Sequence, residues 1–99
     1  MKILAMEKEL PGVSTEQFAP LLESEARAVW KLYLTGSVRE LYFDADVSKA
    51  VLVLDCGSTD EASTILNSLP LVQSRLIKFD LIPLIPYPGF ARLFSNSDP

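Results

Sequence analysis

The apolar residues between positions 14 and 36 recur every three or four places, which is the spacing of one face of an α-helix. Ser14 or Thr15 is a suitable N-cap, and Gly36 is a suitable C-terminal stop. Pro20 lies inside the segment and indicates either a kink or a later start of the regular helix. The predicted apolar face consists of Phe18, Leu21, Leu22, Val29 and Leu32. The pattern therefore predicts one long amphipathic helix that crosses a sheet.

Four other segments are typical of β-strands, and they are Lys2–Leu10, Val38–Asp44, Ala50–Cys56 and Ile77–Ile85. Only a short polar turn separates the second strand from the third, which predicts an antiparallel hairpin. The third strand is almost continuously apolar, as expected for a strand buried on both faces. Pro83 in the fourth strand cannot donate a backbone hydrogen bond, so it predicts an edge position or a bulge.

A second, shorter helix is predicted between the third and fourth strands. It begins at residues 58–60 and ends at Pro70, and residues 71–76 form a connector. The element order β-α-β-β-α-β predicts an α+β, ferredoxin-like fold, in which two helices cover one face of a four-stranded antiparallel sheet. Residues 1–94 would form this single domain, and residues 95–99 a polar C-terminal tail.

The second face of the predicted sheet would still expose apolar side chains, because the third and fourth strands are apolar on both sides. The economical cover for such a face is the same face of a second copy. The sequence therefore predicts an isologous homodimer, or a larger assembly that contains it. A hydrophobic content of 48% in only 99 residues is consistent with this additional burial.

Charge and composition argue against several classes of function. The net charge is −4 with no cluster of Lys and Arg, so no nucleic-acid partner is expected. No apolar run approaches the roughly 20 residues of a membrane span, and no signal peptide is recognisable. The single Cys56 cannot form an intramolecular disulfide, which fits a cytoplasmic location. The absence of histidine removes the usual general base and most zinc and haem ligation, so no metal or cofactor is expected.

Glu25 lies in the middle of the apolar helix face and is the leading candidate for chemistry. In a mostly apolar cleft, desolvation would raise the pKa of its carboxyl group, as suits a general acid or base. The alternative is a structural carboxylate that pairs with Arg39 or with a tyrosine. Strict alternation along the second strand places Arg39, Leu41 and Phe43 on one face, and Val38, Glu40, Tyr42 and Asp44 on the other. Arg39 would either anchor a substrate carboxylate or pair with Glu25.

Aromatic residues are the candidates for a ligand pocket. Trp30 and Tyr33 flank the apolar face and, with Tyr42, would wall a pocket for a flat ligand. By alternation Tyr42 faces away from Arg39, so it joins that pocket only through a bulge or from a partner subunit. Ordinary core packing is the alternative interpretation of all three.

Four sequence features stand at characteristic distances from one another along the chain. Glu25 stands eleven residues before Gly36, and Gly36-Ser-Val-Arg39-Glu-Leu41 has the form G-x-x-R-x-L. A Leu-Pro-Leu sequence ends the second helix at residues 69–71, and Asp80 lies in the fourth strand. Together these features resemble the muconolactone isomerase group of the dimeric α/β-barrel superfamily, over most of the chain to about residue 82.

The resemblance implies a homodimer whose sheets pack face to face, with a cleft between helices and sheet in each subunit. It also implies a cofactor-independent isomerase that acts on a small unsaturated acid or lactone. Glu25 would transfer the proton, Arg39 would hold the carboxylate, and Trp30, Tyr33 and Tyr42 would shape the pocket. The superfamily also includes cofactor-free monooxygenases and proteins with no known activity. Two alternatives stay open: a non-catalytic small-molecule-binding or assembly module, and a cofactor-free monooxygenase.

Overall fold

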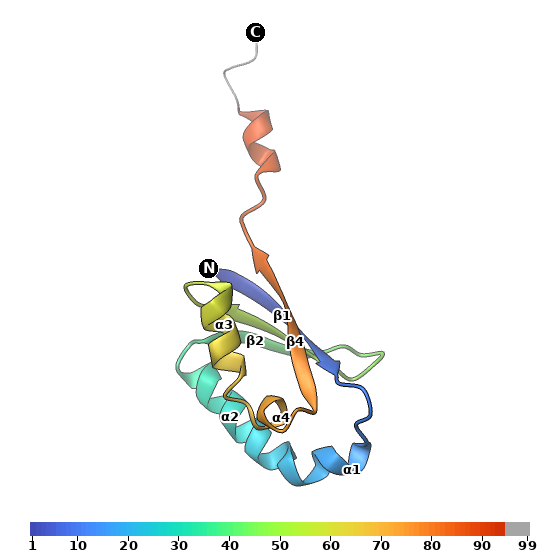
Figure 1. Cartoon of the computed structure of the whole chain (residues 1–99). Coiled ribbons are helices and arrows are strands. Elements are labelled where there is room, and N and C mark those ends of the chain that lie inside the picture. Colours follow the sequence, from blue (N-terminus) through green and yellow to red (C-terminus); the bar gives the residue numbers. More distant parts are fainter. Residues whose placement is uncertain (95–99) are drawn as a thin grey trace.

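A computed structural model of the chain describes residues 1–94, and the polar tail predicted at residues 95–99 lies outside the described residues. Four strands form one antiparallel sheet in the order β2-β3-β1-β4, and the helices lie on one face of it (Figure 1). The strands are β1 (Lys2–Glu9), β2 (Val38–Phe43), β3 (Ala50–Asp55) and β4 (Ile77–Leu84). This arrangement confirms the α+β, ferredoxin-like fold and the hairpin of β2 and β3. β4 is an edge strand, which accommodates Pro83 as predicted.

The predicted long helix is divided into three consecutive pieces. They are α1 (Thr15–Phe18), the 3₁₀ turn η1 (Ala19–Leu21) and α2 (Leu22–Leu34). Ser14 is the N-cap, and its backbone N–H donates to the Gln17 side chain at 2.7 Å. The division falls at Pro20, which has no N–H to continue an α-helical ladder but fits the start of a new turn. The regular helix therefore begins later than its cap indicates.

The second predicted helix is shorter than expected and is followed by another. α3 (Thr59–Leu66) starts after Ser58, whose Oγ accepts the backbone N–H of Glu61 at 3.1 Å. It ends before Pro70, which instead opens the short helix α4 (Pro70–Gln73). The preset φ of proline suits the first position of a helix, so a residue read as a terminator acts here as an initiator. The segment predicted as a plain connector thus contains a helix.

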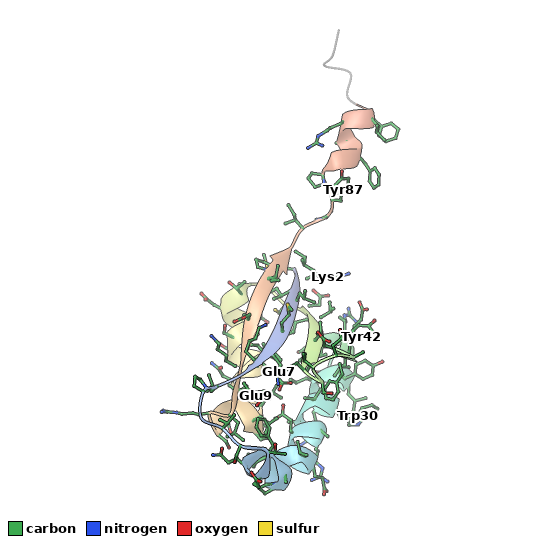
Figure 2. The ribbon with its side chains drawn as sticks, turned by 90° about the vertical axis from the view of Figure 1, so that its right-hand side faces the viewer. Lys2, Glu7, Glu9, Trp30, Tyr42 and Tyr87 are labelled. Carbon is green, nitrogen blue, oxygen red and sulfur yellow. The ribbon has the colours of Figure 1, made fainter. Side chains whose placement is uncertain are left out.

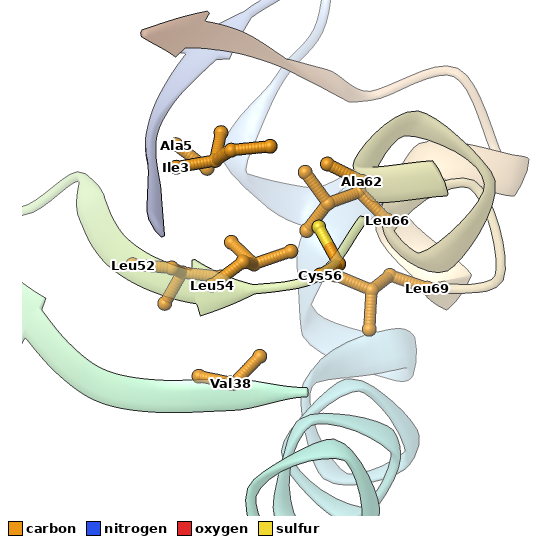
Figure 3. Packing of buried hydrophobic residues seen from close by; sticks show 9 residues of the cluster. All are labelled: Ile3, Ala5, Val38, Leu52, Leu54, Cys56, Ala62, Leu66 and Leu69. Atoms are coloured by element: carbon orange, nitrogen blue, oxygen red, sulfur yellow. The ribbon is translucent and has the colours of Figure 1, made fainter. Parts of the chain in front are cut away.

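The hydrophobic core lies between the sheet and the helices (Figure 3). Ile3, Val38, Leu54 and Leu69 are fully buried, and each represents about 1.5–3 kcal/mol of transfer free energy. The core cluster consists of Ile3, Ala5, Val38, Leu52, Leu54, Cys56, Ala62, Leu66 and Leu69. Cys56 is a free, buried cysteine and packs as a small hydrophobe.

A β-bulge at Arg39 changes the face assignment in β2. Val38 pairs with Leu54, but Glu40 pairs with Val53, so Arg39 is an extra residue without a partner in β3. The prediction from strict alternation is therefore wrong for Val38 and Arg39. It is correct for the opposite faces of Leu41 and Tyr42, which lie beyond the bulge. The residues of β2 opposite Leu54, Leu52 and Ala50 are Val38, Leu41 and Phe43, and these three share the helix side of the sheet.

The other side of the sheet, called the open face below, is covered by no described part of the chain. Register places six apolar side chains there, namely Leu4, Met6, Val51, Val53, Ile82 and Leu84. Val51 and Val53 remain partly exposed, so β3 is not buried on both faces within one chain. The Lys78 and Asp80 side chains lie on the same face and form an exposed ion pair, with Nζ and Oδ1 3.9 Å apart.

Candidate active site

A pocket of about 590 Å³ lies between α2 and the helix side of the sheet. Its lining is mostly apolar and comes from α2, α4 and three of the four strands. The lining residues are Leu22, Glu25, Ala26, Val29, Trp30, Tyr33, Leu41, Tyr42, Phe43, Ala50, Leu52, Leu71 and Phe79. This volume is within the range of small-molecule sites.

Among residues 1–94, Glu25 is the one charged side chain that lines this pocket. Its Oε1 accepts the backbone N–H of Leu71 at 2.9 Å, so the start of α4 fixes the carboxyl group in place. Burial raises the pKa of Glu25 above its ordinary 4.5, the Leu71 N–H opposes this, and the negative charge of Glu7 adds to it. The predicted setting, a carboxyl group in an apolar cleft, is therefore present.

Arg39 lies away from this pocket. Its Nη2 is 3.6 Å from Oδ2 of Asp55, and Oδ1 of the same aspartate is 3.4 Å from the N-terminal amine of Met1. The proposed pair between Arg39 and Glu25 is not formed, because the bulge removes Arg39 from the face that Leu41 and Phe43 share. Asp55, which is unusual in an apolar strand, has two cationic partners instead.

Trp30, Tyr33 and Tyr42 all line the pocket. The ring centroids of Trp30 and Tyr33 are 5.8 Å apart with the rings tilted by 31°. These side chains are about half exposed and not packed in the core. Tyr42 borders the pocket from edge strand β2 without a partner subunit, although its register partner Val51 lies on the open face. Its hydroxyl donates to Oε1 of Glu40 at 2.7 Å, and this hydrogen bond raises the pKa of Tyr42.

Glu7 is a residue of the site that the sequence patterns did not single out. It is paired in register with Phe79, and its Oε1 accepts the backbone N–H of Ala50 at 2.9 Å. Both of these neighbours line the pocket, so Glu7 stands beside it, and Figure 2 shows Glu7 on the central strand β1. The signal was its position in β1, since Ile3, Ala5 and Glu7 alternate on the helix side. Glu7 is thus an acidic residue on an otherwise apolar face of its strand, as Glu25 is on its helix.

Comparison with known proteins supports the fold. No protein-family model matches the chain, and no curated protein matches it in sequence. Among solved structures it is similar to 5-chloro-2-hydroxyhydroquinone dehydrochlorinase from Burkholderia phenoliruptrix AC1100 in complex with 2,5-dihydroxybenzoquinone. The TM-score is 0.67 at 14% sequence identity, over 90% of this chain and 98% of the other. Over the described residues, no helix is long and apolar enough to cross a membrane. The chain thus shares its ferredoxin-like fold, over nearly its whole length, with this structure.

Proposed function

We propose that the chain is a small-molecule enzyme in which Glu25 transfers a proton to and from a ligand bound in the pocket. The observation that carries the proposal is the single half-buried carboxyl group in an otherwise apolar lining. Leu71 holds one oxygen of Glu25, while no hydrogen bond among the described residues engages the other. A raised pKa brings the group closer to the range in which a general base also works as an acid.

The charge of the pocket lining favours a neutral ligand over a carboxylate. No Lys or Arg of the described part of the chain lines the pocket, so a carboxylate ligand would lose hydration there without gaining a cationic partner. The negative charge of Glu25 would repel it further. A neutral, flat, unsaturated ring, such as a lactone or a quinone, fits the apolar walls and the aromatic rings better. The similar structure named above holds a compound of that kind, 2,5-dihydroxybenzoquinone.

For an unsaturated lactone, the proposed reaction is a 1,3-proton shift. The free oxygen of Glu25 takes a proton from the carbon next to the ring carbonyl, and the electron pair moves onto the carbonyl oxygen as an enolate. The hydroxyl group of Tyr33 donates a hydrogen bond to that oxygen. Glu25 then returns the proton to the far carbon of the conjugated system. No bond to oxygen or halogen breaks, and no cofactor is consumed.

We further propose that the chain works as a homodimer joined through its open face. The six apolar side chains of this face lie side by side across β1, β3 and β4. Charged residues surround them, including Lys78, Asp80 and Glu40. A continuous apolar patch with a polar rim is typical of a protein–protein interface, and self-pairing covers both copies at once.

Ligand class is tested by the fluorescence of Trp30, which is the only tryptophan and lines the pocket. An unsaturated lactone and 2,5-dihydroxybenzoquinone should each change the emission with saturation, and a ring-opened carboxylate analogue should bind at least about tenfold more weakly. Ala26→Leu, which fills the pocket, should weaken binding, whereas Ala19→Leu, on the exposed η1 turn, should not. Preference for the carboxylate, or no saturable change with either ring compound, would contradict the proposed ligand.

A further inference from the structure

Residues 85–94, called the C-terminal arm below, leave the domain without packing on it (Figures 1 and 2). The arm continues from the end of β4 and contains the 3₁₀ helix η2 (Gly89–Leu93). Five of its side chains are large, apolar and 66–78% exposed: Ile85, Tyr87, Phe90, Leu93 and Phe94. An exposed apolar segment of this size is characteristic of a contact surface.

The arm has internal order of its own. The rings of Tyr87 and Phe90 meet edge to face, with centroids 5.0 Å apart and planes at 78°. Gly89 is buried beneath the Tyr87 ring, which occupies the space that a Cβ would need. A segment that packs on itself in this way loses less conformational entropy when it docks on another surface.

With the arm extended, the chain has a larger accessible surface than a compact protein of its size. The accessible surface is 7029 Å², whereas a compact protein of this mass exposes about 5,600 Å². The radius of gyration is 17.0 Å, against about 13 Å for a compact chain of this length. The excess of about 1,400 Å² is more than the roughly 800 Å² that one partner buries in a standard interface.

We propose that the arm of one copy docks on a second copy of the chain, against an apolar stripe formed by Trp30, Tyr33 and Leu34. These residues lie three and four positions apart at the C-terminal end of α2, so they share one helix face. All three are substantially exposed. The arm and the stripe are thus two uncovered apolar surfaces of one chain, and a reciprocal exchange covers both.

The sheet order supplies the geometry for this exchange, which rests on the proposed open-face dimer. β2 and β4 are the two edges of the sheet. When two such sheets pack about a two-fold axis parallel to the strands, β4 of one copy lies over β2 of the other. Leu84 pairs with Lys2, and Lys2 pairs with Asp55 on its other side. Leu54, next to Asp55, pairs with Val38. The last residue of β4 and the first residue of β2 therefore lie at the same end of the sheet. The arm then leaves beside the partner's β2 and the end of α2, where the stripe lies.

The test mixes two single-cysteine variants made in a Cys56→Ala background and distinguished by mass. One carries Phe90→Cys in the arm and the other Leu34→Cys in the stripe. After subunit exchange and mild oxidation, a disulfide between the two different chains should form at least about tenfold faster than in a control mixture of Phe90→Cys with Ser63→Cys. Ser63 is exposed on α3 and borders a different, smaller pocket together with Lys78 and Leu81 of β4.

Sedimentation of the full chain and of a chain ending at Leu84 distinguishes the arm exchange from the open-face dimer. The shortened chain should still dimerise but with a dissociation constant at least about tenfold higher, because the arm contacts are lost. A dimeric full chain with cross-linking no faster than the control, or with unchanged affinity after shortening, overturns the arm exchange and leaves the open-face dimer standing. A monomeric full chain overturns both.

Discussion

Glu25→Gln is expected to lower turnover by about 10²–10⁴-fold while leaving the affinity for a ring ligand within a few-fold. The amide is nearly isosteric, and its oxygen still accepts the Leu71 N–H, so the pocket keeps its shape. It cannot accept a proton from carbon at any accessible pH. The loss therefore belongs to the chemical step, and it is measured by following proton exchange between substrate and D₂O by NMR alongside Trp30 fluorescence binding.

The matched control is Glu23→Gln, two residues earlier on the same helix. Glu23 is highly exposed and forms an ion pair with Arg27, with Oε1 and Nη2 3.0 Å apart. An exposed pair of this kind contributes little to stability, so the variant should behave like the parent in both assays. Equal exchange rates in Glu25→Gln and the parent would remove Glu25 from the mechanism. Ligand binding without exchange in any variant would indicate a binding module instead of an enzyme.

Val53→Asp is expected to convert the dimer to monomer, raising the dissociation constant by at least about 30-fold. Val53 lies at the centre of the open face, next to Leu4 in β1 and opposite Glu40 in β2. A carboxylate there would be buried in the interface directly beside the acid Glu40. Because the interface is isologous, each dimer carries the change twice. Analytical ultracentrifugation over a range of concentrations measures the effect.

Val53→Thr serves as the control, since it keeps the β-branched shape and adds a neutral hydroxyl group, which costs less to bury than a charge. It should stay dimeric at concentrations where Val53→Asp is monomeric. Circular dichroism should show both variants folded, because Val53 is only partly buried within one chain. A Val53→Asp variant that is folded and still dimeric would place the interface elsewhere on the molecule.

Much of the fold follows from the hydrophobic pattern, because strands and helices space their apolar residues differently along the sequence. The wrong predictions concern residues at which the local backbone geometry departs from this regular spacing. Pro20 and Pro70 both begin a turn, and the sequence alone does not distinguish an initiating proline from a terminating one. The bulge at Arg39 adds one residue to β2, and one added residue is enough to reverse the faces of a strand.

The candidate site was predictable in part for the same reason. Glu25, Trp30 and Tyr33 are on one helix, so their spacing places them without knowledge of the tertiary structure. The prediction that Arg39 reaches the cleft, either to anchor a carboxylate or to pair with Glu25, assumes an unbroken strand, and the bulge invalidates that assumption. The contact of Glu25 with the backbone of Leu71 spans 46 positions and involves a helix that the pattern did not predict. Such a contact depends on how α4 packs, which no local periodicity encodes.

The measurement that tests the central claim most directly is the pH titration of the Glu25 carboxyl carbon by NMR. Its midpoint should lie above the ordinary 4.5, because burial disfavours the charged form. The folded state then holds its proton more tightly than the unfolded chain, so this group stabilises the fold below 4.5 and that contribution is lost as pH rises through the folded pKa. Glu7→Gln should lower the midpoint by removing a neighbouring charge, and proton exchange should increase with the ionised fraction of Glu25. A midpoint at or below 4.5 would mean that Glu25 is a solvated or paired carboxylate, and it would contradict the assignment of Glu25 as the proton-transferring group.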